Sequence, residues 1–224
     1  MPIALKNVSK VYYIEDKQIN AVNGISAVFA AGKISAIVGK SGCGKTTILK
    51  LIAGLERLSG GSVDIGGQKV GIAFQENRLF PWLDIKQNLG FSSSDITDEQ
   101  IDSMLKLLEI WDFRNAYPEQ ISGGMAQRAA LGRVLLYNPD IVLLDEPFSF
   151  LDYFTRKALQ AVLAKLQKNL KKTILLVTHD LNEALSLADD IYMMKEGFFT
   201  GKINFQNGET QREKYTEQIL NLIS

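Results

Sequence analysis

The stretch Gly39-Lys40-Ser41-Gly42-Cys43-Gly44-Lys45-Thr46 decides how this chain folds. Strand-prone residues 34–38 precede it and helix-prone residues 47–53 follow it, which predicts a strand, a glycine-rich turn and a helix. The spacing of its glycines, lysine and threonine matches the phosphate-binding loop, whose backbone N–H groups and helix start point at a phosphate chain. We therefore predict a nucleoside triphosphate site, with Lys45 at the outer phosphates and the Thr46 hydroxyl on magnesium (Mg²⁺).

Composition sets limits on the function. The chain has 224 residues, with 25 basic and 25 acidic side chains, so its formal net charge is zero. A zero net charge gives no electrostatic case for nucleic acid as the main partner. Its single cysteine excludes an internal disulfide, and its first residues lack the apolar core of a signal peptide. The apolar runs are too short to span a bilayer. We expect a cytoplasmic protein that reaches the membrane only through a partner.

The first 29 residues predict a small antiparallel β layer. We expect an edge strand at residues 3–13, a polar loop at 14–20 and a second strand at 21–29.

The rest of the chain predicts an α/β core with a mostly parallel sheet, because buried apolar runs alternate with amphipathic helices. Residues 85–133 read almost entirely as helix, and Thr97 and Gln100 resemble a capping box. We expect a single domain in which residues 1–84 and 134–224 form the catalytic core and residues 85–133 form a helical subdomain. Thr210 and Glu213 are expected to cap a last helix that ends at Ile223.

Two further patterns carry chemistry. Four apolar residues place Asp145 and Glu146 at the carboxyl end of a buried strand, where open α/β sheets bind ligands. Asp145 is then placed to reach Mg²⁺ and Glu146 to deprotonate an attacking water, although a strand that simply ends in a polar turn is the alternative. Ser122-Gly123-Gly124 at a helix start makes a second anion-binding nest or, equally, an ordinary helix cap.

Together these patterns resemble the ATP-binding cassette (ABC) ATPase family. Six motifs follow the family's order over essentially the whole chain: residues 39–46, Gln75, Ser122-Gly123-Gly124, Leu143-Leu144-Asp145-Glu146-Pro147, Ser149-Phe150-Leu151-Asp152 and His179. The resemblance implies a P-loop NTPase core with an N-terminal antiparallel β layer and an inserted helical subdomain. It also implies that two copies pair head to tail around ATP.

The resemblance assigns a role to each motif residue. Residues Gly39, Lys40, Ser41, Gly42, Cys43, Gly44, Lys45, Thr46 and Thr47 hold the phosphates. Thr46, Gln75 and Asp145 bind Mg²⁺, and Gln75 also touches the attacking water. Glu146 is the general base, and His179 contacts the γ-phosphate. Ser122, Gly123 and Gly124 close on the ATP of the second copy, and Asp152 organises the seam between the copies.

Several residues keep an alternative interpretation. Tyr12 matches the family position that stacks on adenine, with Tyr13 as the fallback, but either tyrosine fits plain packing on the β layer. Cys43 reads as a small filler within the loop. Phe80 and Trp82, just past Gln75, are expected to meet a permease helix or to pack internally.

The resemblance implies the ATP-hydrolysing subunit of a membrane importer, working with permease subunits and, indirectly, an external binding protein. Met125, where the family more often has glutamine, points to the importer branch for nitrate, sulfonates and taurine, or else to a weakened signature. A soluble ABC ATPase acting on nucleic acid or the ribosome is the runner-up. A catalytically inactive regulator is a third class, against which Glu146 and His179 argue.

Overall fold

A computed structural model describes residues 1–149, 151–205 and 215–223. Phe150, Thr210 and Glu213, on which sequence-based expectations fall, lie outside the described residues. In this part of the chain, no helix has the length and apolar character needed to cross a bilayer.

The N-terminal layer is a small antiparallel sheet, as predicted. Its strands are β1 (Ile3–Ile14), β2 (Lys17–Phe29) and β4 (Gly60–Asp64), in the order β2-β1-β4. The expected polar loop at residues 14–20 is wrong, because only Glu15 and Asp16 separate the two long strands. The expected edge position of β1 is also wrong, because β1 is the central strand. Residues 17–20 are all exposed and contain only one apolar side chain, Ile19, so they lack an alternating apolar pattern, yet their backbone still pairs with β1.

The second sheet is mostly parallel, which confirms the predicted core. Its strand order is β5-β6-β7-β3-β8-β9, and only the β8–β9 pair is antiparallel. The strands are β3 (Ile34–Val38), β5 (Val70–Ala73), β6 (Ile141–Asp145), β7 (Thr173–Thr178), β8 (Asp190–Lys195) and β9 (Phe198–Asn204). The parallel strands β3, β6 and β7 therefore end at one edge, which brings the loops after them together.

Both faces of this sheet are covered. On β6, Ile141 and Leu143 join the core shared with α1 (Lys45–Ile52) and the small sheet. Val142 and Leu144 face the opposite way, into the core that the other helices complete. Burial on both faces explains why the strand reads as an unbroken apolar run.

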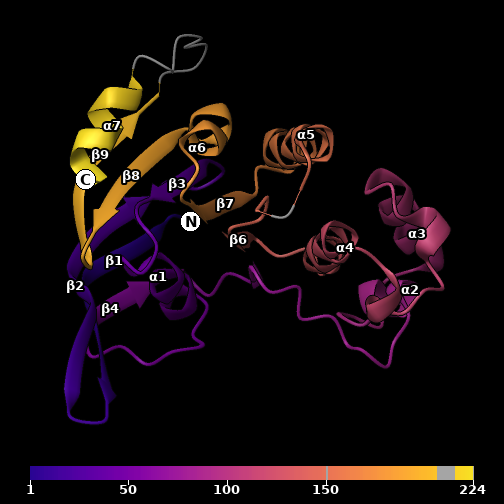
Figure 1. The fold of residues 1–224 in the computed structure, drawn as a ribbon, viewed down its shortest axis with the longest axis horizontal. Helices are drawn as coiled ribbons and strands as arrows, with labels where there is room; N and C mark the ends of the chain where they lie inside the picture. Colours follow the sequence, from indigo (N-terminus) through magenta and orange to yellow (C-terminus); the bar gives the residue numbers. More distant parts are fainter. Residues whose placement is uncertain (150, 206–214, 224) are drawn as a thin grey trace.

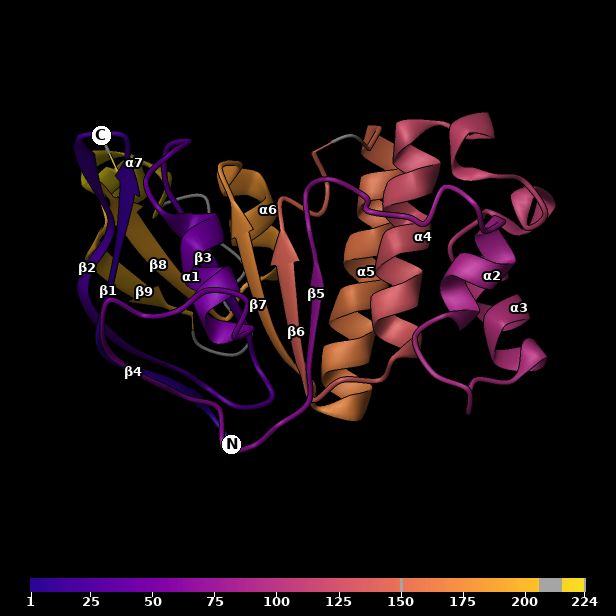
Figure 2. The same ribbon diagram turned by 90° about the horizontal axis from the view of Figure 1, so that it is seen from below.

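The other helices complete the second core and a helical end. Figures 1 and 2 show α2 (Ile85–Gly90), α3 (Asp98–Leu107) and α4 (Gly123–Leu136) at the end opposite β2 and β9. The capping box at the start of α3 is confirmed, because Thr97 and Gln100 exchange hydrogen bonds of 3.3 and 2.9 Å. The remaining helices are α5 (Tyr153–Leu170), α6 (Leu181–Leu187) and α7 (Thr216–Ile223), with short 3-10 helices at Trp111–Phe113 and Pro118–Gln120.

One buried amide shapes the loop before α2. The fully buried side chain of Asn88 accepts from the backbone N–H of Phe80 at 2.8 Å. It donates to the backbone oxygens of Phe80, Leu83 and Asp84 at 3.0–3.1 Å. Pro81 in this loop has no backbone N–H to donate, and the Asn88 side chain supplies hydrogen bonds in place of those that a regular helix would make.

We expect Asn88→Ala to lower the free energy of unfolding by about 2 kcal/mol, because it leaves buried backbone groups without partners. Equilibrium urea denaturation measures the change. Asn182→Ala, at an exposed position of α6, is the matched control and should leave the transition in place. Coincident unfolding curves for the Asn88 variant and the wild type would contradict this role.

Candidate nucleotide site

One cavity collects much of the predicted site at the carboxyl edge of the parallel sheet. Its volume of about 420 Å³ lies in the range of small-molecule sites. Predicted residues supply most of its lining: Ser41, Gly42, Cys43, Gly44, Lys45, Thr46, Thr47, Gln75 and Glu146. Gly39 and Lys40 belong to the same loop and contribute carbonyl groups to it.

The loop conformation requires glycine at two positions. Gly44 has a φ of 108° at the start of α1, and a side chain there would meet the carbonyl oxygen of Ala21. A side chain on Gly39 would meet the carbonyl oxygen of Met194. The backbone is therefore free to turn and to offer the N–H groups of the α1 terminus to an anion.

Lys45 places a buried positive charge in this loop. Its ammonium donates to the carbonyl oxygens of Gly39 at 2.8 Å and Lys40 at 3.0 Å, and the residue is only 6% exposed. No carboxylate among the described residues forms an ion pair with it. This buried cation contacts only carbonyl groups, so an incoming phosphate would neutralise its charge.

Thr46 and Asp145 form a pair suited to Mg²⁺. The Thr46 hydroxyl donates to Asp145 Oδ1 at 3.0 Å, which joins the start of α1 to the end of β6. Burial raises the pKa of the Asp145 carboxyl above its usual range, although the hydrogen bond from Thr46 works in the opposite direction. The described residues contain no group of three or more His, Cys, Asp or Glu side chains arranged for a metal. The pair fits an ion that takes few protein oxygens and completes its shell with water and phosphate.

Glu146 and His179 meet where β6 and β7 end. Glu146 Oε2 lies 2.8 Å from His179 Nδ1, and the carboxylate lines the cavity while the histidine side chain is 64% exposed. Glu146 has a positive φ of 48°, fixed by a bond from its N–H to Val177 O at 3.0 Å and one from Ser149 Oγ to its own carbonyl at 3.0 Å. A non-glycine residue held in this conformation is strained, and such strain concentrates at functional sites.

Other predicted residues lie outside the cavity. Ser122 and Gly123 are exposed at the start of α4, where Ser122 Oγ accepts from Met125 N at 3.3 Å, and Gly124 follows them. Asp152 caps α5 by accepting from the N–H groups of Phe154 and Thr155, and its bond with the Thr155 side chain holds the pKa of this carboxyl below its usual range. The roles predicted for these residues across two copies stay predictions.

Tyr12 stands beside the cavity instead of in its lining. Its Cα pairs with that of Ile19, which does line the cavity, and Lys10 Nζ lies 4.7 Å from the centre of the Tyr12 ring. The fallback, Tyr13, is 76% exposed. Stacking of Tyr12 on adenine stays a prediction.

One wall of the cavity is not predicted from the sequence; it is formed by Ile19, Asn20, Ala21, Glu196 and Gly197. The β8–β9 turn reaches the phosphate loop through a bond from Gly197 N to Cys43 O at 3.0 Å. No motif marks this contact, because it depends on the pairing of distant strands. Cys43 itself is buried, which raises the pKa of its thiol and agrees with its role as a filler.

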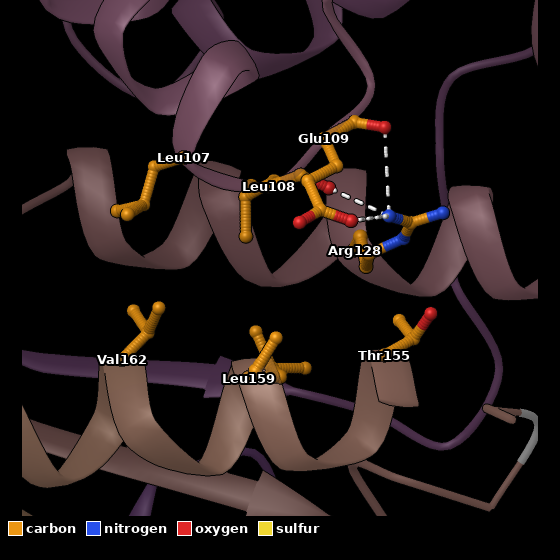
Figure 3. A pocket seen from close by; sticks show the side chains of 8 residues that line it. Leu107, Leu108, Glu109, Arg128, Thr155, Leu159 and Val162 are labelled. Atoms are coloured by element: carbon orange, nitrogen blue, oxygen red, sulfur yellow. Dashed lines mark hydrogen bonds and ion pairs between the residues drawn. The ribbon is translucent and has the colours of Figure 1, made fainter. Parts of the chain in front are cut away.

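A second hollow lies between α4 and α5 (Figure 3). Arg128 of α4 closes one end of the hollow by donating to the carbonyl oxygen of Leu108 at 2.8 Å. Thr155, Leu159 and Val162 of α5 line the opposite side of the hollow. Apolar side chains dominate its lining, and none of the predicted site residues belongs to it. It is a packing gap between helices and has no chemistry of the phosphate loop.

Comparison with known proteins points to one family. Residues 22–149 match the family model described as ABC transporter. An aliphatic sulfonates import ATP-binding protein, SsuB, of Bacillus subtilis (strain 168) is 38% identical over 87% of this chain and 80% of its own length. The corresponding SsuB 2 of Pseudomonas syringae pv. tomato is 44% identical over 77% of this chain and 75% of its own length.

The fold has a solved counterpart as well. A dimeric post-hydrolysis state of the ATP-binding cassette MJ0796, bound to ADP and Pi, superposes with a TM-score of 0.85 at 30% identity, over 92% of this chain and 99% of that one. This agreement confirms the predicted ABC ATPase fold. The chain therefore belongs to the ABC transporter family, as one of its ATP-hydrolysing cassettes.

Proposed function

We propose that this chain energises a membrane importer for a small anion, with aliphatic sulfonates as the favoured cargo. The observation that carries the enzymatic part is the Glu146 carboxylate, which lines the phosphate-loop cavity and is held by His179 at 2.8 Å. The cargo rests on the names of the relatives, which are sulfonate import proteins at 38% and 44% identity. Taurine and nitrate are the neighbouring choices.

Hydrolysis in this proposal is an in-line attack by water on the γ-phosphorus of ATP. Glu146 takes the proton of the water as its oxygen bonds to phosphorus, and the bond from phosphorus to the ADP oxygen breaks. Lys45 neutralises the outer phosphates, Gln75 orients the water, and His179 holds Glu146 and meets the γ-phosphate. Thr46, Asp145 and Gln75 would hold Mg²⁺, which when bound shields the charge of the β- and γ-phosphates.

The site is completed by a second copy in this proposal. Ser122 and Gly123 are exposed, and a side chain added at Gly123 would meet only open space. The helix start that they form therefore has room for the γ-phosphate of ATP bound to another copy. The dimeric state of the related cassette supports this arrangement. Closure of the dimer by ATP and reopening after hydrolysis would drive the permease.

An aromatic patch, composed of Phe80, Trp82 and Phe91, is proposed to receive the permease. Trp82 is 69% and Phe91 61% exposed, and the ring of Phe80 lies 5.5 and 4.4 Å from theirs. The bonds of Asn88 to Phe80 fix this loop just downstream of Gln75. A movement of the patch would therefore occur close in the sequence to Gln75, the residue proposed to orient the attacking water.

The alternative function, a soluble ABC ATPase acting on nucleic acid or the ribosome, has less support. The formal net charge is zero, and the relatives reported above are named for import.

Deleting the gene should abolish uptake of a radiolabelled alkanesulfonate in the organism that carries it. Restoring the wild-type chain should restore uptake, whereas Lys45→Ala should not, because the phosphates lose their buried cation. Uptake of labelled taurine and nitrate is measured in parallel. Unchanged sulfonate uptake in the deletion strain would remove sulfonate as the cargo.

Glu146→Gln should lower ATP turnover by about 10²- to 10⁴-fold while ATP still binds, because the amide cannot accept the proton. Phosphate release measures turnover, and size-exclusion chromatography with ATP should detect an accumulated dimer. Glu119→Gln, at an exposed carboxylate of the helical end, is the matched control. Full turnover in the Glu146 variant would exclude it as the base.

Replacing Trp82 and Phe91 together by serine should abolish co-purification with the permease, because the exposed aromatic surface is lost. Hydrolysis by the isolated cassette should persist. Phe198→Ser, at a 52% exposed position at the start of β9, serves as the control. Strand β9 lies at the end of the molecule opposite α2 (Figure 1). Permease recovery equal to that of the wild type would place the docking surface elsewhere.

A further inference from the structure

Arg156, in the first turn of α5, bridges two segments that lie far apart in the sequence. Its Nη2 donates to the carbonyl oxygen of Leu151 at 3.3 Å, within the segment that also carries Asp152. Its Nη1 donates to Asp180 Oδ2 at 3.3 Å and lies 3.8 Å from Glu183 Oε1. One guanidinium therefore contacts the loop before α5 and the start of α6.

The two acids that Arg156 reaches are linked to the residues on both sides of His179 through the Thr178 hydroxyl. Glu183 Oε2 accepts from Thr178 Oγ1 at 2.6 Å, and the same hydroxyl accepts from Asp180 N at 3.0 Å. Thr178 and Asp180 are the chain neighbours of the histidine. The histidine ring thus projects from a turn whose two ends are fixed by one network.

Glu183 is the buried acid of this network. Glu183 is 4% exposed, and burial raises the pKa of its carboxyl while the charge of Arg156 works in the opposite direction. The Arg156 side chain is 30% exposed. The planar guanidinium spans a carbonyl and two carboxylates at once, which a lysine ammonium at the end of a flexible stem does not reproduce.

We propose that Arg156 is a positioning residue for hydrolysis, which sets the place of His179 relative to Glu146 from the segment that carries Asp152. The inference rests on the proposed function, in which His179 and Glu146 act on ATP. Arg156 is not among the residues lining the cavity, so it acts through the turn that holds the histidine. A shift of the Leu151–Asp152 segment would be transmitted by this side chain to the turn that carries His179.

A purely structural clamp between α5 and α6 is the competing explanation, and kinetics distinguishes the two. Arg156→Lys keeps the charge beside Glu183 but loses the fork, so we expect kcat to fall by about 10- to 100-fold with the affinity for ATP unchanged. In the His179→Ala background, the same substitution should cause no further loss in single-turnover hydrolysis. Lys157→Met, at the next and exposed position of α5, should match the wild type.

Folding is controlled separately. Arg156→Met leaves the buried Glu183 carboxylate without its cation, so Arg156→Met with Glu183→Gln removes the guanidinium and neutralises the more buried of its two carboxylate partners. That double variant should unfold at the wild-type urea concentration and still show the loss of kcat. Urea denaturation and nucleotide affinity are measured for every variant.

Three outcomes overturn the inference. They are wild-type kcat in Arg156→Lys, a loss of equal size with and without His179, and a loss that tracks only the stability of each variant. A failure of the proposed function is distinguished from these outcomes by a different variant. Full ATP turnover in Glu146→Gln would contradict the proposed function, whatever the kinetics of the Arg156 variants.

Discussion

The buried ammonium of Lys45 is the constraint around which the site is built. Its only hydrogen bonds within the described chain go to the carbonyl groups of Gly39 and Lys40, so the cation is desolvated without being neutralised. Holding such a charge requires a backbone that turns tightly, which explains the glycines, and a rigid base, which the buried strand β3 and helix α1 supply. In the proposed function, the phosphate chain of a nucleotide neutralises this charge. Thr46, Asp145 and Glu146 are arranged around the place where that chain would lie.

The sequence predicted the parts of the molecule in which local pattern and tertiary structure agree. The apolar run of β6 followed by Asp145 and Glu146 reads as a buried strand with carboxylates at its end, and it is one because both faces are covered. The phosphate loop was equally clear, since its residue types are demanded by local backbone geometry. Thr97 predicted the start of α3 because a capping box forms between residues close in the sequence. In each case the deciding interactions lie within a few residues.

Features that depend on distant pairing were missed. The hairpin of β1 and β2 continues through residues 17–20, which are exposed and contain a single apolar side chain, and Ile19 and Asn20 line the cavity only because that hairpin extends. The bridge made by Arg156 was invisible for the same reason. Its partners Leu151, Asp180 and Glu183 come together only when α5 and α6 pack beside β7. The contact proposed between Ser122 and the ATP of a second copy depends on assembly, not on local sequence.

The contact of Gly197 with the phosphate loop ties the order of synthesis to the appearance of the site. Gly197 N donates to Cys43 O, and Asn23 N donates to Gly197 O, so one wall of the cavity joins residues that are far apart in the sequence. During synthesis the phosphate loop therefore leaves the ribosome well before the β8–β9 turn that completes this wall. Nucleotide binding that uses this wall can stabilise the nascent protein only after that turn has been made.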